Sequence, residues 1–158
     1  LSFELFNAMA GTSIAAIAYK GDGPALTDIV GGQVPIGSVS VAGAISHVKS
    51  SRVRPIAVYS AQRSPSMSDV PTVAEAGLPG FEAGTFNVLI GPAALPAPVV
   101  QRLNALHNEA MGKPLLRERY LQMGMVTVIN SPQQTTDFLT REMAKWAKVI
   151  KEANIQIQ

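Results

Sequence analysis

The sequence contains no cysteine, few charged residues and no long apolar run. Without cysteine the chain forms no disulfide, and it offers neither a thiolate for zinc or an iron–sulfur cluster nor a thiol nucleophile. No apolar stretch approaches the roughly 20 residues that a membrane-spanning helix needs. Charged residues make up 15% of the chain and the formal net charge is +2. This excess is too mild for the concentrated basic face that binds nucleic acid, so we expect no nucleic-acid partner.

Recognisable catalytic motifs are missing as well. The chain has no G-x-S-x-G elbow, no P-loop and no complete G-x-G-x-x-G followed by an acidic residue. His47 and His107 fall in separate helical patterns without a ligand partner at metal spacing, and the acidic residues are scattered. We therefore expect no catalytic residue, no metal site and no cofactor.

What is present is an apolar, globular composition. Hydrophobic residues make up 47% of the 158 residues, enough for a sizeable core in one domain or in part of a larger protein. The opening stretch LSFELFNAMAG carries Glu4 and lacks a basic leader, so it resembles a helix rather than a signal peptide. Because the chain begins with Leu1, we interpret it as a processed or truncated product.

The first half alternates helical and strand-like patterns. Gly11 ends the first helix, Pro24 suits the first turn of the second, and Gly31 and Gly32 end it. Alternating helices and strands are typical of an α/β unit with a parallel sheet. The predicted helices are 1–10, 24–30 and 41–50, and the predicted strands are 13–19, 33–40 and 53–60.

The second half is predicted to be an ordered loop followed by helices. Residues 60–84 are rich in Pro, Ser and Gly, with a short helix predicted at 71–77 and with Val70, Val73, Ala74 and Leu78 as apolar anchors. Strands are predicted from Thr85 and over 125–130, and helices from Ala97, over 114–124 and from Ser131-Pro132. The last helix has an apolar face formed by Leu139, Met143, Trp146 and Ile150.

The end of the first predicted strand is a candidate ligand site. In open α/β sheets, ligands bind beyond the carboxyl ends of strands, where glycine turns and helix starts expose amides to an anion. Residues Tyr19 to Gly23, with Gly21 and Gly23 in the turn, have this character. Lys20 either adds a cation or is simply a solvated side chain of an ordinary turn. Asp22 argues against an anion unless its side chain is used in capping a helix.

Two further positions complete the candidate site. Ser38, near the end of the second predicted strand, can donate to a ligand oxygen, whereas Ser40 is either a ligand contact or the N-cap of the next helix. Thr85 and Phe86 open a later strand. Phe86 is either a core residue or a platform for a ligand.

Three strings together resemble a known family. They are YKGDGPALTDIVGGQV, RPIAVYSAQRSPSMSDVPTVAEAGLPGFE and EMAKWAKVIKEANI. In this order they are similar to the Bug proteins, the TctC-like extracytoplasmic solute receptors of tripartite tricarboxylate transport systems. The likeness extends from Leu1 to about the end of the chain.

The resemblance implies a periplasmic protein with the two-lobe α/β fold of type II periplasmic binding proteins, here incomplete. Residues 1–81 would form most of the inserted lobe, 82–96 a crossover strand and turn, and 97–158 the C-terminal portion of the other lobe. It implies a small carboxylate as ligand and membrane permease subunits as partners. It also implies that Tyr19, Lys20, Gly21, Gly23, Ser38, Ser40, Thr85 and Phe86 face the ligand cleft.

Two other functions stay open. A small α/β enzyme could use Lys20 as an acid or base, and a ligand-sensing module could pass its signal to another protein. For the favoured solute-binding function we expect weak binding by this chain alone, and self-association through an exposed apolar face of the C-terminal helices.

Overall fold

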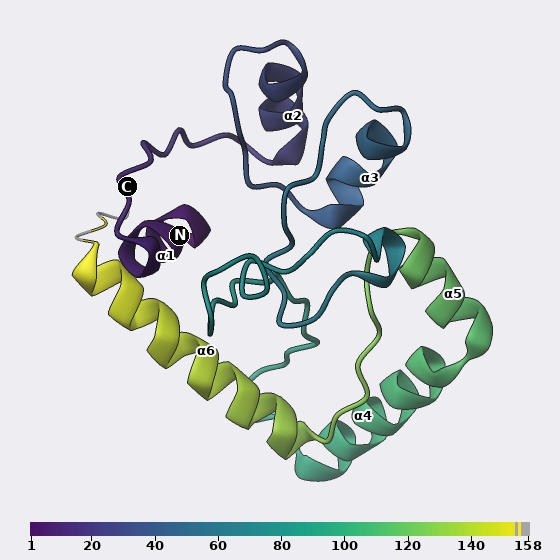
Figure 1. Ribbon diagram of the computed structural model, residues 1–158. Helices are drawn as coiled ribbons and strands as arrows, with labels where there is room; N and C mark the ends of the chain where they lie inside the picture. Colours follow the sequence, from purple (N-terminus) through teal and green to yellow (C-terminus); the bar gives the residue numbers. More distant parts are fainter. Residues whose placement is uncertain (154, 156–158) are drawn as a thin grey trace. The chain divides into compact units, whose positions relative to one another are not determined.

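A computed structural model describes residues 1–153 and 155 of the chain (Figure 1). The chain divides into two compact units. Unit 1 comprises Leu1–Thr85 with Met123–Met125, and unit 2 comprises Phe86–Gln122 with Val126–Gln158. The division after Thr85 falls inside the predicted crossover 82–96, while the assignment of these parts to lobes stays a prediction.

The helices of unit 1 confirm the predicted helices of the first half. They are α1 (Ser2–Ala10), α2 (Asp22–Val30) and α3 (Val41–Lys49). The unit also contains the short 3-10 helix η1 (Pro65–Met67), which was not predicted. Gly11 ends α1 and Gly31 ends α2, as predicted. Helix α2 begins at Asp22, two residues ahead of Pro24. Proline fits there because the amides of a first helical turn have no acceptor within the helix.

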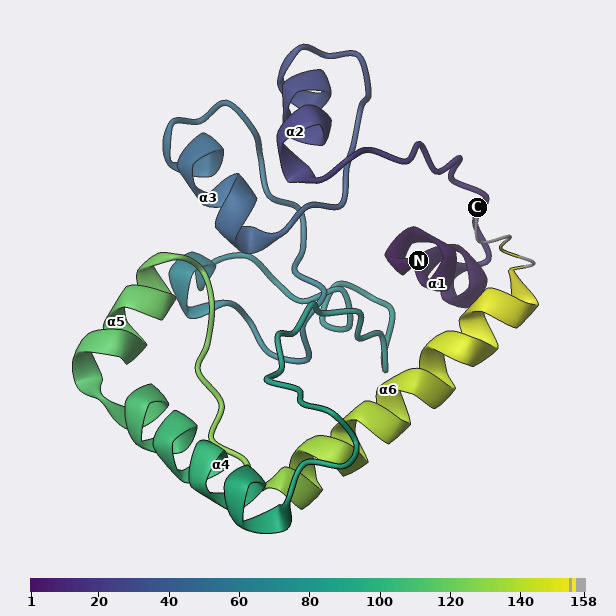
Figure 2. The ribbon, with the colours of Figure 1, turned by 180° about the vertical axis from the view of Figure 1, so that it is seen from behind.

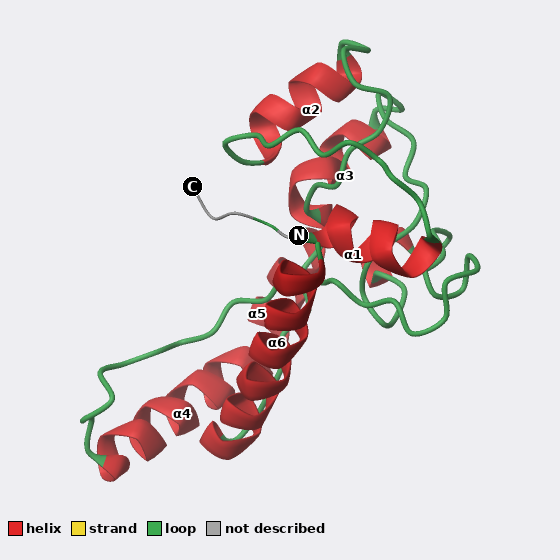
Figure 3. Cartoon of the chain, turned by 90° about the vertical axis from the view of Figure 1, so that its left-hand side faces the viewer, coloured by secondary structure: helices red, strands yellow, loops and turns green. Residues whose placement is uncertain are grey.

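The predicted parallel sheet does not appear among the described residues. The one β pairing recorded among them is an isolated parallel bridge between Val58 and Thr72, and Figure 3 shows loops where strands were expected. A short apolar run predicts extended backbone, but a strand also needs a neighbour that pairs with its amides and carbonyls. The expected strand residues Ile17 and Ile56 are instead 64% and 68% exposed.

The core of unit 1 lies in the Pro- and Gly-rich segment. Phe81 is 1% exposed, and its ring meets Tyr59 and Phe6 edge-on at centroid distances of 5.1 and 6.0 Å. The amides of Val58 and Val73 and that of Ala83 donate to backbone carbonyls across this segment. Its buried side chains are Val58, Ser64, Val70, Thr72, Val73, Phe81 and Ala83. The prediction of an ordered loop anchored by Val70 and Val73 is confirmed.

The short helix predicted at 71–77 does not form, although its start signal is present. The amide of Glu75 donates to Thr72 Oγ1 at 3.0 Å, and the amide of Thr72 donates to Glu75 Oε2 at 2.8 Å. This reciprocal pair is a capping box. Gly77, with φ of 125°, and Pro79 follow so soon that the segment remains a turn.

Unit 2 consists of α4 (Ala97–Gly112), α5 (Pro114–Gln122) and α6 (Pro132–Glu152), and α4 contacts both of the others (Figure 2). Asn104 and Asn108 each donate a side-chain hydrogen bond of 2.9 Å to the carbonyl of Asn130. These bonds fix the segment before α6. The predicted strand 125–130 is not paired in the described residues, so this expectation is also wrong there.

The start of α6 is confirmed and its predicted apolar face is partly wrong. Ser131 and Gln134 form a capping box, with Pro132 in the first turn. Leu139, Trp146 and Ile150 are half-buried, but Met143 is 72% exposed because no described part of the chain covers it.

Candidate ligand-binding site

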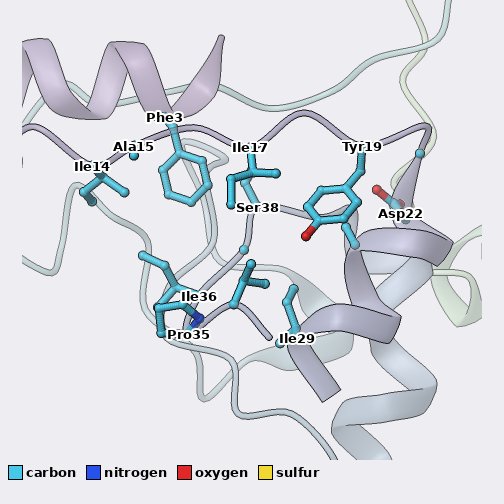
Figure 4. A pocket seen from close by; sticks show the side chains of 14 residues that line it. Phe3, Ile14, Ala15, Ile17, Tyr19, Asp22, Ile29, Pro35, Ile36 and Ser38 are labelled. Carbon is cyan, nitrogen blue, oxygen red and sulfur yellow. The ribbon is translucent and has the colours of Figure 1, made fainter. Parts of the chain in front are cut away.

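Unit 1 contains a pocket of about 300 Å³ beside the start of α2 (Figure 4). Its wall comes from α1, from α2 and from two extended segments, 14–19 and 34–38. Most of the wall is apolar, and the polar side chains are those of Tyr19, Asp22 and Ser38. The lining residues are Phe3, Ile14, Ala15, Ile17, Tyr19, Gly21, Asp22, Ala25, Ile29, Val34, Pro35, Ile36, Gly37 and Ser38.

The pocket brings together part of the predicted site. Tyr19, Gly21 and Ser38 line it, although they lie up to 19 positions apart in the chain. Lys20 and Gly23 are exposed neighbours that do not line it, and Ser40 lies at the start of α3.

The other two predicted site residues, Thr85 and Phe86, do not line the pocket. Thr85 is the exposed last residue of the main segment of unit 1, and Phe86 belongs to unit 2. There the Phe86 ring meets Phe138 edge-on at 4.8 Å and remains 43% exposed. Half of its surface is thus used in packing, and its role toward a ligand stays a prediction.

The start of α2 is suited to an anion. Gly21 is the N-cap with φ of 97°, a conformation that side-chain-bearing residues rarely adopt, and no side chain caps this helix. The first-turn amides of Asp22 and Gly23 therefore have no side-chain acceptor. Together with the helix dipole they attract a carboxylate or phosphate oxygen.

The Asp22 carboxylate is used at the neighbouring helix. Its Oδ2 accepts hydrogen bonds from the Ser40 hydroxyl and from the Ser40 amide, the latter at 3.2 Å. Ser40 Oγ in turn accepts from the Gly43 amide at 3.0 Å, which makes Ser40 the N-cap of α3. The structural interpretation of Ser40 therefore holds, and Asp22 caps a helix other than its own.

Tyr19 lines the pocket, and Tyr59 is connected to it through a hydrogen bond with Ser38. Tyr19 donates a 2.8 Å hydrogen bond to Asp28 Oδ2, and this bond, with partial burial and the carboxylate charge, raises the Tyr19 pKa. Burial raises the pKa of Tyr59, and a side-chain hydrogen bond with Ser38 opposes that rise. Ser38 thus links the pocket to the aromatic core around Phe81.

The described residues offer little else of chemical interest. Within residues 1–153 and 155, no cluster of three or more His, Asp or Glu side chains could hold a metal ion. In the same part of the chain, no helix combines the length and apolarity needed to cross a membrane.

Sequence reasoning missed most of the apolar wall. Phe3 reaches the pocket from α1, and Ala25 and Ile29 reach it from α2. Ala25 and Ile29 share one face of their helix at a spacing of four residues, so the pattern could have indicated a common neighbour. Phe3 carries no such signal, because its position depends on how α1 packs.

Comparison with known proteins identifies a family. The family described as "Tripartite tricarboxylate transporter family receptor" (TctC) matches residues 1–155. A UPF0065 protein of Bordetella bronchiseptica is 38% identical over 97% of this chain and 45% of its own length.

Solved structures give the same result. "R. palustris Rpa4515 with adipate" matches with a TM-score of 0.85 and 33% identity over 98% of this chain and 52% of that chain. "MatC (Rpa3494) from Rhodopseudomonas palustris with bound malate" matches with a TM-score of 0.72 and 28% identity over 94% of this chain and 52% of that one. The backbone therefore follows the path of a periplasmic-binding-protein fold even where its extended segments are not paired.

The chain spans about half the length of these relatives. The match nevertheless runs along almost the whole chain, and it agrees with the resemblance carried by the YKGDGPALTDIVGGQV and DVPTVAEAG strings. The chain belongs to the TctC family, the receptors of tripartite tricarboxylate transporters.

Proposed function

We propose that this chain is the ligand-binding part of an extracytoplasmic solute-binding protein that takes up a small organic acid as its carboxylate. The observation that carries the proposal is the convergence of Gly21 and Ser38 on one pocket beside the uncapped start of α2. Adipate and malate, bound by two structural relatives, are small carboxylates of the same kind.

In this proposal binding depends on backbone groups more than on charged side chains. The first-turn amides of α2 receive one carboxylate of the ligand, and Ser38 lines the pocket beside them. Two lobes close on the ligand in the complete protein, and closure excludes water and strengthens these hydrogen bonds. The receptor then passes its ligand to permease subunits in the membrane, which places it in the periplasm.

Catalysis is not part of the proposal. Lys20, the one residue considered as an acid or base, is exposed and does not line the pocket. No observation favours the ligand-sensing alternative over transport, whereas membership of a transporter receptor family favours transport.

Titration of the ¹⁵N-labelled chain with adipate or malate, followed by NMR, tests the proposal. NMR detects weak, millimolar binding, which we expect when only part of a two-lobe site is present. The amide signals of Gly21, Asp22, Gly23, Ala25 and Ser38 should move together and saturate. Unchanged signals at these residues under high concentrations of both acids, and of a monocarboxylate of similar length, would refute carboxylate binding here.

A matched pair of glycine variants locates the site. Gly21→Ala forces a side chain into a backbone conformation with φ of 97° and should weaken binding. Gly84→Ala adds a methyl group where no heavy atom lies within 4 Å, and it should leave binding unchanged. Equal effects of the two substitutions would show that the ligand does not bind at the start of α2.

Transport requires a different readout. The complete reading frame, expressed with its permease subunits in bacteria that lack uptake of the acid, should restore uptake. Binding without uptake would support the role of the protein as a receptor for the acid, and it would contradict delivery of the acid to these permease subunits.

A further inference from the structure

Among the described residues, the pocket wall carries a negatively charged side chain and no positively charged one. It includes the Asp22 carboxylate, yet no lysine, arginine or histidine of the described chain lines it. The phenol of Tyr19 is already engaged as a donor to Asp28. A negatively charged group that reached beyond the start of α2 would therefore find no cation of the described residues to pair with.

Asp22 sharpens this asymmetry. Its Oδ2 accepts hydrogen bonds from the amide and hydroxyl of Ser40 at the N-terminus of α3, so the position of the carboxylate beside the pocket is fixed. One ligand carboxylate can be received by the first-turn amides of α2. Those amides offset the nearby Asp22 charge for the first carboxylate only. A second would have no such donors and would lie near the Asp22 charge or against hydrocarbon, where an unpaired charge is costly.

The remaining wall suits an apolar body. Phe3, Ile17, Ile29 and Ile36 present hydrocarbon to the space (Figure 4). Ile17 and Ile36 are 64% and 41% exposed, so a ligand that covers them removes apolar surface from water. A chain or ring of carbon atoms with a single charged end fits both features.

We infer that this site selects small monocarboxylates with an apolar body over dicarboxylates, and that Asp22 is a specificity-determining residue. The inference rests on the proposed function and narrows its ligand class. It assigns one carboxylate to the start of α2 and the hydrocarbon to the wall formed by the four side chains named above.

Hexanoate and adipate form a matched pair for the test, because both are six-carbon acids and adipate carries a second carboxylate. NMR titration of the chain near neutral pH should give a dissociation constant for hexanoate lower than that for adipate by a factor of about ten or more. Asp22→Asn removes the charge and keeps an acceptor for Ser40, and it should reduce this ratio by improving adipate binding. Asp69→Asn, at an exposed position outside the pocket, is the control and should leave the ratio unchanged.

A second variant keeps the test decisive if Asp22→Asn fails to fold. Ile17→Lys places a cation at an exposed position of the wall and should shift the preference toward adipate, whereas Ile17→Gln should not. Equal or tighter binding of adipate by the unmodified chain would overturn the inference and leave carboxylate binding intact. If the ratio of the two dissociation constants stays the same in Asp22→Asn, Asp22 does not determine the specificity. Binding of neither acid would overturn the proposed function together with the inference.

Discussion

The carboxylate of Asp22, in the first turn of α2, accepts hydrogen bonds from both the amide and the hydroxyl of Ser40, the N-cap of α3. One side chain thereby ties together the beginnings of two helices that also contact each other. It fills the anion-attracting end of α3 with a group of the protein itself. At the corresponding end of α2 no side chain accepts a hydrogen bond from the first-turn amides, which is why we assign the ligand to it.

Ser40→Ala should destabilise unit 1. The substitution removes the acceptor of the Gly43 amide and the donor to Asp22, and loss of a serine N-cap costs about 1–2 kcal/mol. Urea unfolding followed by circular dichroism measures the change in the free energy of unfolding. Ser46→Ala, at an exposed site in the same helix, should change it by less than about 0.5 kcal/mol. Equal losses in both variants would contradict the capping role.

Gly124→Ala should also destabilise the fold. Gly124 has φ of 75°, and an added Cβ would lie 2.5 Å from Val41 Cγ1 and 3.2 Å from the Ala42 nitrogen. Overpacking and an unfavourable backbone conformation together cost about 1–3 kcal/mol. The same unfolding experiment measures this loss, with Gly84→Ala as the unhindered control. Stability equal to that of the control would show that Gly124 does not pack against the start of α3.

Glu75 should make stability depend on acid pH. The Thr72 amide and then the Arg63 side chain donate to its carboxylate and lower the Glu75 pKa in the folded chain. The folded state therefore binds this proton less readily than the unfolded chain, whose pKa is near 4.5. The stabilisation is complete above that value and disappears as the pH falls through the lower folded value.

The urea midpoint, measured from about pH 6 down to about pH 3, tests this expectation. The unmodified chain should lose more stability over this range than Glu75→Gln. Glu118→Gln, an exposed glutamate on α5, controls for the general loss of one carboxylate. A Glu75→Gln profile parallel to that of the unmodified chain would exclude the proposed linkage.

Self-association should occur through α4. Val99, Leu103 and Leu106 follow helical spacing, and they are 41%, 41% and 43% exposed. Sedimentation velocity should show a species larger than the monomer as concentration rises, and Leu103→Glu should return it to monomer because the added charge resists burial. Gln101→Glu, an exposed position outside this stripe, should leave association unchanged. A monomer at all concentrations would contradict the prediction.

The helices were predictable because their signals are local. Gly11, Pro24, Ser40 and Ser131 act on the turn in which they lie, so short stretches of sequence were enough. The strands were not, because a short apolar run indicates extended backbone and says nothing of the neighbouring strand that must pair with it. The capping box at Thr72 was likewise overridden, since Gly77 and Pro79 leave no length for a helix.

The residues of the candidate site also divide into those that local sequence patterns predict and those whose place depends on packing. Gly21 and Ser38 were predicted because they follow apolar segments, and the structure places both at one pocket. The contribution of Phe3 and the bond from Ser40 to Asp22 depend on how helices pack, which no local pattern encodes. Phe86 falls in the other unit, so its predicted place beside the ligand stays a prediction.

The buried turn around Thr72 has a consequence for interpreting natural variation. Thr72 and Phe81, at 2% and 1% exposure, lie in a stretch whose composition is that of a surface connection. A saturation mutagenesis screen scored on soluble yield should find this stretch as intolerant as the interior of a helix bundle. Prediction rules that treat substitutions in loops as neutral would underestimate the effect of substitutions in this stretch.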